Sequence, residues 1–256
     1  MYLSGIRPTG RLHLGNYLGC IKPFIERQGP EDVFFIADLH SEPSAALERD
    51  TFVTQAACNR IGIANVCIES HSRFGIMEIA HGLSFHVTTG QLGRMTQFKD
   101  KTSRGEDPTL SLFSYPVLMA ADIFYYGQPK ILVGADQKQH VEFARDLYDK
   151  VGKKMGFKHK PEPVFSDTPR VMNLQDASEK MSKSSAKQDG IIYLDDTTDE
   201  IARKVRAAKT STSVTDDTQE MNNLRAIYKG LGGTENFDGC KLFKDALTEL
   251  LIKAVK

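Results

Sequence analysis

Two lysines surround two hydroxyls in the segment Glu-Lys-Met-Ser-Lys-Ser, which runs from Glu179 to Ser184. Reaction at the α-phosphorus of a nucleotide places negative charge on the departing pyrophosphate, and positioned cations are the main way in which a protein stabilises that charge. Lys180 and Lys183 therefore predict a loop that holds phosphate. The alternative for an isolated Lys-x-x-Lys pair is a charged surface loop.

A second candidate phosphate site is the tetrapeptide His-Leu-Gly-Asn, from His13 to Asn16. It lies between a glycine-bearing turn, Gly5 to Gly10, and a helix expected to start near Tyr17. Free backbone N–H groups and the positive end of that helix would face an anion. His13 can donate to a phosphate oxygen, and Gly15 lets a nucleotide approach the backbone. Taken alone, the tetrapeptide is more typical of a helix cap followed by a turn.

A third group of residues points to an aromatic ligand. Tyr115, Met119 and Asp122 are spaced i, i+4 and i+7, which places them on one face of a helix. Met119 offers a sulfur contact to an aromatic ring, and Asp122 can accept a hydrogen bond from an indole N–H, the only polar atom of that ring. Such a pocket would reject an analogue without the donor by about 10⁴-fold. The alternative is a core helix with a structural aspartate, because apolar residues surround these three.

Short apolar runs alternate with longer amphipathic ones, which predicts repeated βα units around a parallel sheet. The expected strands are Tyr2 to Ile6, Val33 to Ala37, Val66 to Glu69 and Lys130 to Val133. The expected helices are Tyr17 to Glu26, Ala45 to Ile61, Leu110 to Tyr125, Gln137 to Val151, Asn222 to Lys229 and Cys240 to Val255. The polar segment Thr210 to Thr218, which precedes the last two of these helices, is typical of a linker or mobile loop. The fold class that we expect is α/β, with a Rossmann-like, doubly wound parallel sheet and a small C-terminal helical domain.

Polar residues follow three of the expected strands at the point where each strand ends. In a doubly wound sheet the ligand binds outside the carboxyl ends of the strands, so these residues should meet at one edge. They are Gly5, Arg7 and Thr9 after the first strand, Asp38 and His40 after the second, and Gly134, Asp136 and Gln137 after the Lys130 to Val133 strand.

Composition limits the classes of protein to which these motifs can belong. The 256 residues can bury one full core with a smaller appendage, and the formal charge of zero means that any contact with RNA must be local. The four cysteines lack the spacing of a zinc site, so we expect no metal site. With no apolar run of membrane-spanning length and no leader-like N-terminus, we expect a soluble, cytoplasmic protein without a membrane partner.

Together, the first two motifs resemble the HIGH and KMSKS signatures of class I aminoacyl-tRNA synthetases. Longer stretches are similar to the tryptophanyl-tRNA synthetase family of the bacterial type, and the similarity extends over nearly the whole chain. Met119 supports this, because the tyrosyl family typically has glutamine there. These stretches are Ser4 to Gly10, His13 to Gly19, Met95 to Lys101, Tyr115 to Ile123 and Gly134 to His140.

The resemblance implies a tryptophan–tRNA ligase that works as a homodimer with ATP and Mg²⁺. It would form tryptophanyl-adenylate from L-tryptophan and pass the acyl group to tRNA(Trp). The implied catalytic residues are Lys180, Lys183, His13 and Lys101. The implied nucleotide contacts are Arg7, Pro8, Thr9, Gly15, Asn16, Gly134, Asp136, Gln137, Val171, Met181, Ser182 and Ser184. The implied amino-acid contacts are Tyr115, Met119, Asp122, Val133, Gln137 and His40.

Three features depart from the family pattern. Arg7 replaces the usual glutamine and adds a cation, which would contact phosphate or point to solvent. The cysteine spacing does not match the iron–sulfur cluster that some members carry. The chain also ends at Lys256, where the family continues through further helices. We therefore expect a Rossmann-like catalytic domain at 1–195, which includes a connective insertion and the KMSKS loop, and a partial helical, anticodon-binding-like domain at 196–256. A paralogue that forms the adenylate without charging tRNA efficiently, and a non-catalytic paralogue that binds RNA or protein, are the alternatives.

Overall fold

The computed structural model describes residues 1–165, 170–183 and 185–255, and its centre is a parallel sheet of five strands. The strands are β1 (Tyr2–Ile6), β2 (Val33–Ile36), β3 (Val66–Ile68), β4 (Lys130–Val133) and β5 (Glu162–Phe165), in the spatial order β3-β2-β1-β4-β5. The order reverses between β1 and β4, and this reversal is the topological switch point of a doubly wound sheet.

Helices cover both faces of the sheet because side chains alternate between the faces along each strand. In β2, Phe34 and Ile36 join one apolar cluster, while Phe35 joins the other. The first cluster lies against α1 (Leu14–Asn16), the helical turn Tyr17–Ile21 and α2 (Lys22–Ile25), with Cys58 from α3 (Ala45–Arg60). The second is filled from α4 (Arg73–Ser84), α7 (Leu110–Tyr126) and α8 (Lys138–Leu147).

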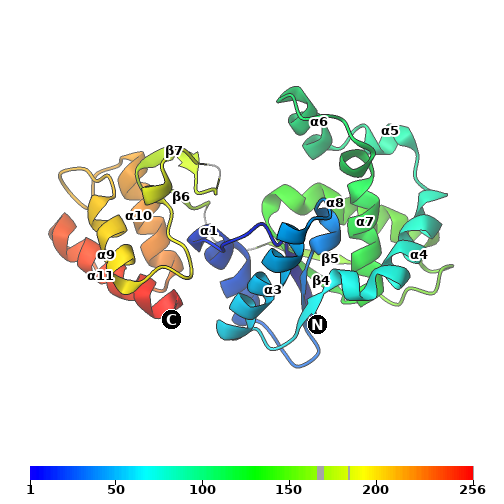
Figure 1. Cartoon of the computed structure of the whole chain (residues 1–256), viewed down its shortest axis with the longest axis horizontal. Helices are drawn as coiled ribbons and strands as arrows, with labels where there is room; N and C mark the ends of the chain where they lie inside the picture. The colour runs from blue at the N-terminus through cyan, green and yellow to red at the C-terminus, as the bar shows by residue number, and fades with distance from the viewer. Residues whose placement is uncertain (166–169, 184, 256) are drawn as a thin grey trace.

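A helical insertion separates β3 from β4. It contains α4, α5 (Thr89–Leu92) and α6 (Thr96–Ser103), and α7 then returns the chain to the sheet. Figure 1 shows α5 and α6 projecting from the body of the molecule, above α7. Gly127 ends α7 with a φ of 69°, a left-handed conformation that glycine adopts without a steric penalty.

The C-terminal part is a second lobe, drawn in yellow to red in Figure 1. It begins with the antiparallel pair β6 (Met172–Asn173) and β7 (Asp176–Lys180) and continues through α9 (Thr198–Ala207), α10 (Gln219–Gly230) and α11 (Cys240–Val255). Its apolar residues, such as Ile201, Leu224 and Leu247, belong to the same cluster as Phe34 and Ile36 of the sheet. One core therefore extends from the sheet into this lobe.

Each element expected from the sequence is present, with small differences at the ends. The second and third strands are each one residue shorter than expected, and helix α10 is longer at both ends. Strand β5, helices α4 to α6 and helix α9 were not expected. The segment 210–218 has no regular structure, but Asp216 accepts hydrogen bonds from the Ser211 and Thr212 hydroxyls and from Ser213 N. Within the described ranges, no helix has the length and apolarity needed to cross a bilayer.

Candidate active site

The Lys180 to Lys183 segment lies against the turn after β1. The Lys183 ammonium donates to the Thr9 carbonyl oxygen at 2.5 Å and to the Thr9 hydroxyl at 3.0 Å, 174 residues away in the chain. Burial lowers the pKa of Lys183 to about 8, although Asp50 opposes this shift. Two of the segments that the sequence assigned to phosphate are thus in direct contact, at the end of β1.

His13 lies close to both lysines and is kept neutral. Burial, then the charges of Lys183 and Lys180, lower its pKa to about 4. Its Nδ1 atom is buried without a hydrogen-bond partner in the described part of the chain. A Cβ on Gly15 would lie 3.0 Å from the His13 ring and 3.9 Å from the Met181 carbonyl oxygen, so glycine allows this close packing. His13 can therefore act as a neutral donor, with a free ring nitrogen.

The backbone holds the lysine segment in register with its neighbours. Lys180 pairs with Met172 in the β6–β7 ladder, and Met181 N donates to the Val171 carbonyl oxygen at 3.0 Å. The side chains of Val171 and Met181 are buried in the core, so their contribution to a ligand site is to fix the backbone. Asn16 accepts from His13 N at 3.0 Å, which fixes the start of α1. Ser182 is half-buried, and Ser184 lies outside the described residues.

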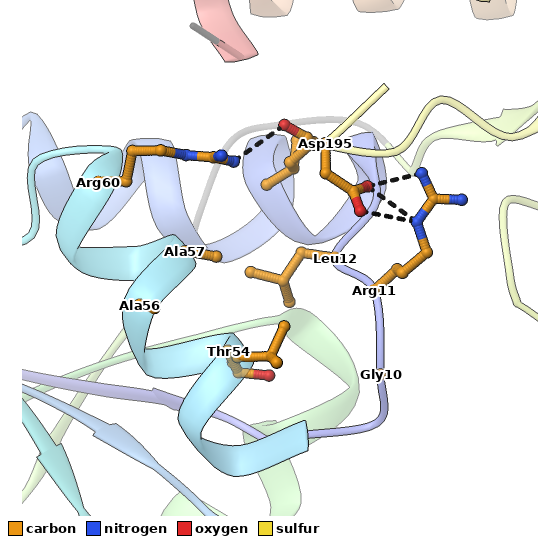
Figure 2. Close-up of a pocket in the computed structure, with 10 residues that line it drawn as sticks. Gly10, Arg11, Leu12, Thr54, Ala56, Ala57, Arg60 and Asp195 are labelled. Carbon is orange, nitrogen blue, oxygen red and sulfur yellow. Dashed lines mark hydrogen bonds and ion pairs between the residues drawn. The ribbon is translucent and has the colours of Figure 1, made fainter. Parts of the chain in front are cut away.

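Beside the same turn, a pocket of about 300 Å³ lies between α3 and the turn at Leu194 and Asp195, which precedes α9 in the second lobe. Figure 2 shows Arg11 reaching across to Asp195, and Arg11 also pairs with Asp196 at 3.1 Å. Arg60 of α3 donates to the Leu194 carbonyl oxygen at 3.3 Å. These contacts join Arg11, just before His13, and helix α3 to the C-terminal lobe.

A polar network links Tyr115 to the turn after β4. The Tyr115 hydroxyl donates to Gln97 Oε1 at 2.8 Å and lies 2.5 Å from His140 Nε2, while His140 Nδ1 lies 3.1 Å from Gln137 Oε1. Burial lowers the pKa of His140 to about 4. Gln137 in turn donates to Asp136 at 3.0 Å, so Asp136, Gln137 and Tyr115 belong to one connected group.

The Gly134 backbone lies close to this group. A Cβ at Gly134 would stand 2.8 Å from Asp136 Oδ1, which excludes larger residues without a shift of that carboxylate. Glycine at this position thus keeps Asp136 beside the end of β4, as the strand order predicts.

Three ionisable residues meet at the base of the Tyr115 face of α7. His40 Nε2 lies 2.8 Å from Asp122 Oδ2 and 3.8 Å from Glu69 Oε1, and both carboxylates have no exposed surface. Asp122 Oδ1 and Glu69 Oε1 have no hydrogen-bond partner among the residues that the structure describes. Ligand atoms of the three lie within 4.8 Å of one another, a grouping that would also suit a metal ion. A proton shared by the two acids accounts for the same grouping without an ion.

The remaining predicted contacts are Arg7, which carries a charge, and the apolar residues Met119, Val133 and Pro8. Burial lowers the pKa of His40 and raises that of Tyr115, and Arg7 lies close enough to both for its charge to favour a lower pKa in each. Its charge therefore reaches the amino-acid side of the site. Met119 and Val133 are half-buried and pack at the edge of the second apolar cluster. Pro8 is buried.

Lys101 is the predicted residue that the structure does not bring to the others. It lies on α6 and pairs with Glu106 at 3.0 Å, and Figure 1 shows α6 apart from β7, the strand that ends at Lys180.

Three residues of the site were missed by sequence reasoning. Glu69 ends the Val66 to Glu69 segment, and its position after a strand was the available signal. Gln97 lies within the recognised stretch Met95 to Lys101 and His140 within Gly134 to His140, but the sequence pattern assigned no role to either residue. Asp38, which was grouped with the site, accepts from Ser70 N at 2.9 Å and ties the ends of β2 and β3 together.

Known proteins with similar sequences are consistent with this geometry. The family model described as tRNA synthetases class I (W and Y) matches residues 1–231. A tryptophan–tRNA ligase from Nostoc sp. is 38% identical over 283 residues, which cover 99% of this chain and 84% of that protein. One from Rickettsia bellii is 38% identical over 279 residues, covering 98% of this chain and 83% of that protein. The 283 aligned positions exceed the 256 residues of this chain, so some internal segments are shorter here than in the Nostoc protein.

Solved structures of tryptophanyl-tRNA synthetases are also similar to this chain. The tryptophanyl-tRNA synthetase of Mycoplasma pneumoniae has a TM-score of 0.84 at 30% identity, covering 99% of this chain and 85% of that chain. That of Campylobacter jejuni, complexed with ADP and tryptophan, has a TM-score of 0.77 at 29% identity and covers the same shares. A tyrosyl-tRNA synthetase from Aeropyrum pernix, 19% identical with a TM-score of 0.71, shares the fold.

Proposed function

The chain belongs to the class I tRNA synthetases of the tryptophan and tyrosine group, and from that premise we propose that it activates L-tryptophan with ATP and transfers it to tRNA(Trp). Asp122 is the observation that carries the choice of amino acid. One of its oxygens is held by His40, and the other is buried without a partner in the described chain. An indole N–H would satisfy that oxygen, whereas a purely hydrocarbon ring would leave it unpaired.

The pocket around Asp122 suits an aromatic ring. Met119 lies one helical turn away on the same face of α7, and Tyr115 lies one turn further, with its ring 6.2 Å from that of His40. Val133 and Gln137, at and just after the end of β4, would border the same space. A thioether and an aromatic edge favour a flat, polarisable ligand.

ATP would lie with its phosphates between the His13 segment and the lysine segment. The tryptophan carboxylate oxygen attacks the α-phosphorus, a new O–P bond forms, and the bond to the departing pyrophosphate breaks. Lys180 and Lys183 would stabilise the charge that grows on pyrophosphate, and His13, neutral because of its lowered pKa, would donate an N–H to a phosphate oxygen. Thr9 would lose its bond to Lys183 as phosphate replaces it.

The other nucleotide contacts follow from the strand ends. Gly15 and Asn16 would lie under the nucleotide at the start of α1, with Arg7 and Pro8 in the turn before it. Gly134 and Asp136 would face the adenosine from the end of β4, and the Val171 and Met181 backbone would border it. Mg²⁺ would neutralise the phosphate oxygens, and Lys101 would reach them once it leaves Glu106.

We propose a homodimer built on the exposed apolar face of α4 and the end of α7. Phe74 is 84% exposed and Phe85 75%, while Met77 and Tyr125 are 45% and 40% exposed. Large apolar side chains in one patch mark an interaction surface. A site of action in the cytoplasm follows from the location of the proposed substrates, ATP and tRNA.

Tryptophan-dependent ATP–pyrophosphate exchange tests the activation step, with tyrosine and phenylalanine as controls. We expect exchange with tryptophan alone, and exchange with no amino acid would contradict the proposal. Charging of tRNA with labelled tryptophan then separates a complete ligase from an enzyme that only forms the adenylate. Binding of RNA without exchange would instead support a non-catalytic paralogue.

A further inference from the structure

Glu69 is a second buried acid beside Asp122, and the proposed reaction gives it no role. Glu69 starts the short helix after β3, Asp122 lies in the middle of α7, and neither side chain has exposed surface. Glu69 Oε2 accepts from Leu39 N at 3.1 Å, which leaves Oε1 as the oxygen that faces His40 and Asp122. Two ionised carboxylates this close, in an environment of low dielectric constant, repel each other strongly, so the pair holds a proton.

The surroundings assign that proton to Glu69. His40 contacts Asp122 at 2.8 Å but lies 3.8 Å from Glu69, so Asp122 has the better partner for its charge. Burial, then the charge of Asp122, raise the pKa of Glu69 to about 9. Burial also raises the pKa of Asp122, but a hydrogen bond with Glu69 opposes that rise.

We propose that Glu69 is a positioning acid for the amino-acid pocket: it stays protonated, donates its proton to Asp122, and so keeps that carboxylate ionised and oriented toward the indole N–H. The proposal rests on the proposed role of Asp122 as the acceptor of the indole. It adds that the acceptor is set by a second acid on a different element. A tryptophan ligand would then meet one negative charge at the base of the pocket instead of two.

Several other titratable groups face Glu69 and Asp122, and their titration must be distinguished from that of Glu69. His40 lies on the turn after β2 and feels Asp38 and Arg7, and burial lowers its pKa, so it is neutral well below pH 9. Tyr126 of α7 has its hydroxyl buried without a partner in the described chain, and burial raises its pKa far above 9. Burial also raises the pKa of Cys67 on β3, above an ordinary value of 9.0. Glu69 is thus the group that titrates first as the pH rises toward 9.

The test compares Glu69→Gln and Glu69→Leu with the unaltered enzyme, measured as tryptophan KM in ATP–pyrophosphate exchange between pH 7 and 10. Glutamine is a permanent neutral donor of the same shape, whereas leucine has no donor. We expect Glu69→Gln to keep the KM within about twofold at pH 7.5, and Glu69→Leu to raise it by about tenfold or more, the effect of one lost charge-assisted hydrogen bond. The KM for ATP should stay within about twofold in both variants.

The pH profile gives a readout that a merely structural role would not change. In the unaltered enzyme the tryptophan KM should rise by about tenfold from pH 8 to 10, as Glu69 ionises beside Asp122. In Glu69→Gln the KM should rise less over this range, because Glu69 no longer titrates and only the α-amino group of the tryptophan ligand still does. An equal rise in Glu69→Gln would overturn the proposal, and Cys67→Ser would then show whether the thiol causes it.

Three further results would count against the proposal. Loss of tryptophan binding in Glu69→Gln as large as in Glu69→Leu would mean that a charge at Glu69 is required. A stoichiometric divalent ion in the purified enzyme that is lost in Glu69→Gln would assign the cluster to metal. If Asp122→Ala leaves the preference for tryptophan unchanged, the role of Asp122 fails. The shared proton would still be supported if the melting temperature falls less in Glu69→Gln than in the unaltered enzyme as the pH rises from 7 to 9, because Lys183 titrates equally in both.

Discussion

The two ends of the candidate site differ in how they handle charge. At the amino-acid end, Asp122 and Glu69 are fully buried, and Asp122 contacts His40 at 2.8 Å. At the phosphate end, Lys180 is exposed and Lys183 half-buried, and Lys183 is bound to a backbone carbonyl that phosphate can replace. Burial makes an unpaired group costly, which suits discrimination, while accessible cations on short loops suit a charge that arrives with the substrate and leaves with the product.

The largest effect should come from removing the buried acceptor. Asp122→Ala should lower the preference for tryptophan over an analogue without the indole N–H by about 10²- to 10⁴-fold, because no buried oxygen is left to penalise the analogue. The KM for ATP should change by about twofold at most. Competing exchange assays with the two amino acids measure this, and Met119→Leu, on the same face of α7, is the matched control. A comparable loss of ATP affinity would show that Asp122 serves both ends.

Removing a cation at the phosphate end should act on the rate instead. Lys183→Ala should slow adenylate formation by about 10- to 100-fold, the equivalent of one charge-assisted hydrogen bond to the leaving pyrophosphate. Lys187, four residues away and paired with Asp176, is the matched control, and Lys187→Ala should be close to neutral. Single-turnover kinetics separate the rate from tryptophan binding, and an unchanged rate would refute the role of the loop.

The same lysine predicts how ATP binding depends on pH. The free enzyme has a Lys183 pKa of about 8, so the ammonium is present below pH 8 and is lost as the pH rises through that value. The KM for ATP should therefore rise by up to about tenfold between pH 7 and 9, while that for tryptophan should stay flat until the range in which Glu69 ionises. Lys183→Arg should move the rise out of this range, because the guanidinium stays charged. A rise that persists in this variant would assign the titration to another group.

The smallest effect should come from Lys101. Unlike Lys183, its ammonium is already paired with a carboxylate, that of Glu106. Lys101→Ala should raise the KM for ATP by about threefold, since breaking an exposed ion pair offsets part of any gain from phosphate. Glu106→Gln, which frees the lysine, should lower that KM slightly. Initial rates at varied ATP concentration measure both changes, and an effect as large as that of Lys183→Ala would place Lys101 among the principal cations.

The difference between the two ends of the site also bears on which features could be predicted from the sequence. The parallel, doubly wound sheet follows from apolar periodicity and from the alternation of strands and helices, and this prediction is confirmed. The structure adds the spatial order, in which β2, β1 and β4 are neighbours. The connective insertion was expected, but its helices α4 to α6 were not placed, because they are short or, in α4, expose large apolar side chains, which weakens the periodic pattern. Glu69 was missed because its importance comes from Asp122, 53 residues away, and no local pattern records that a carboxylate is buried beside another.

Arg7 was expected to contact phosphate or to point to solvent, and that expectation stays a prediction. The structure adds that its charge also acts on His40 and Tyr115. The division at residue 195, the individual ligand contacts and the dimer stay predictions.

The apolar cluster that runs from the sheet into the C-terminal lobe bears on how the molecule melts. Phe34 of β2 and Leu247 of α11 belong to a single buried network, so neither lobe can lose its packing without exposing the other. Heating should therefore give one calorimetric transition whose enthalpy matches the two-state value, and a fragment cut after residue 195 should aggregate or stay partly unfolded. Catalysis would then require the helices beyond the lysine segment, because they keep the sheet beneath the site folded.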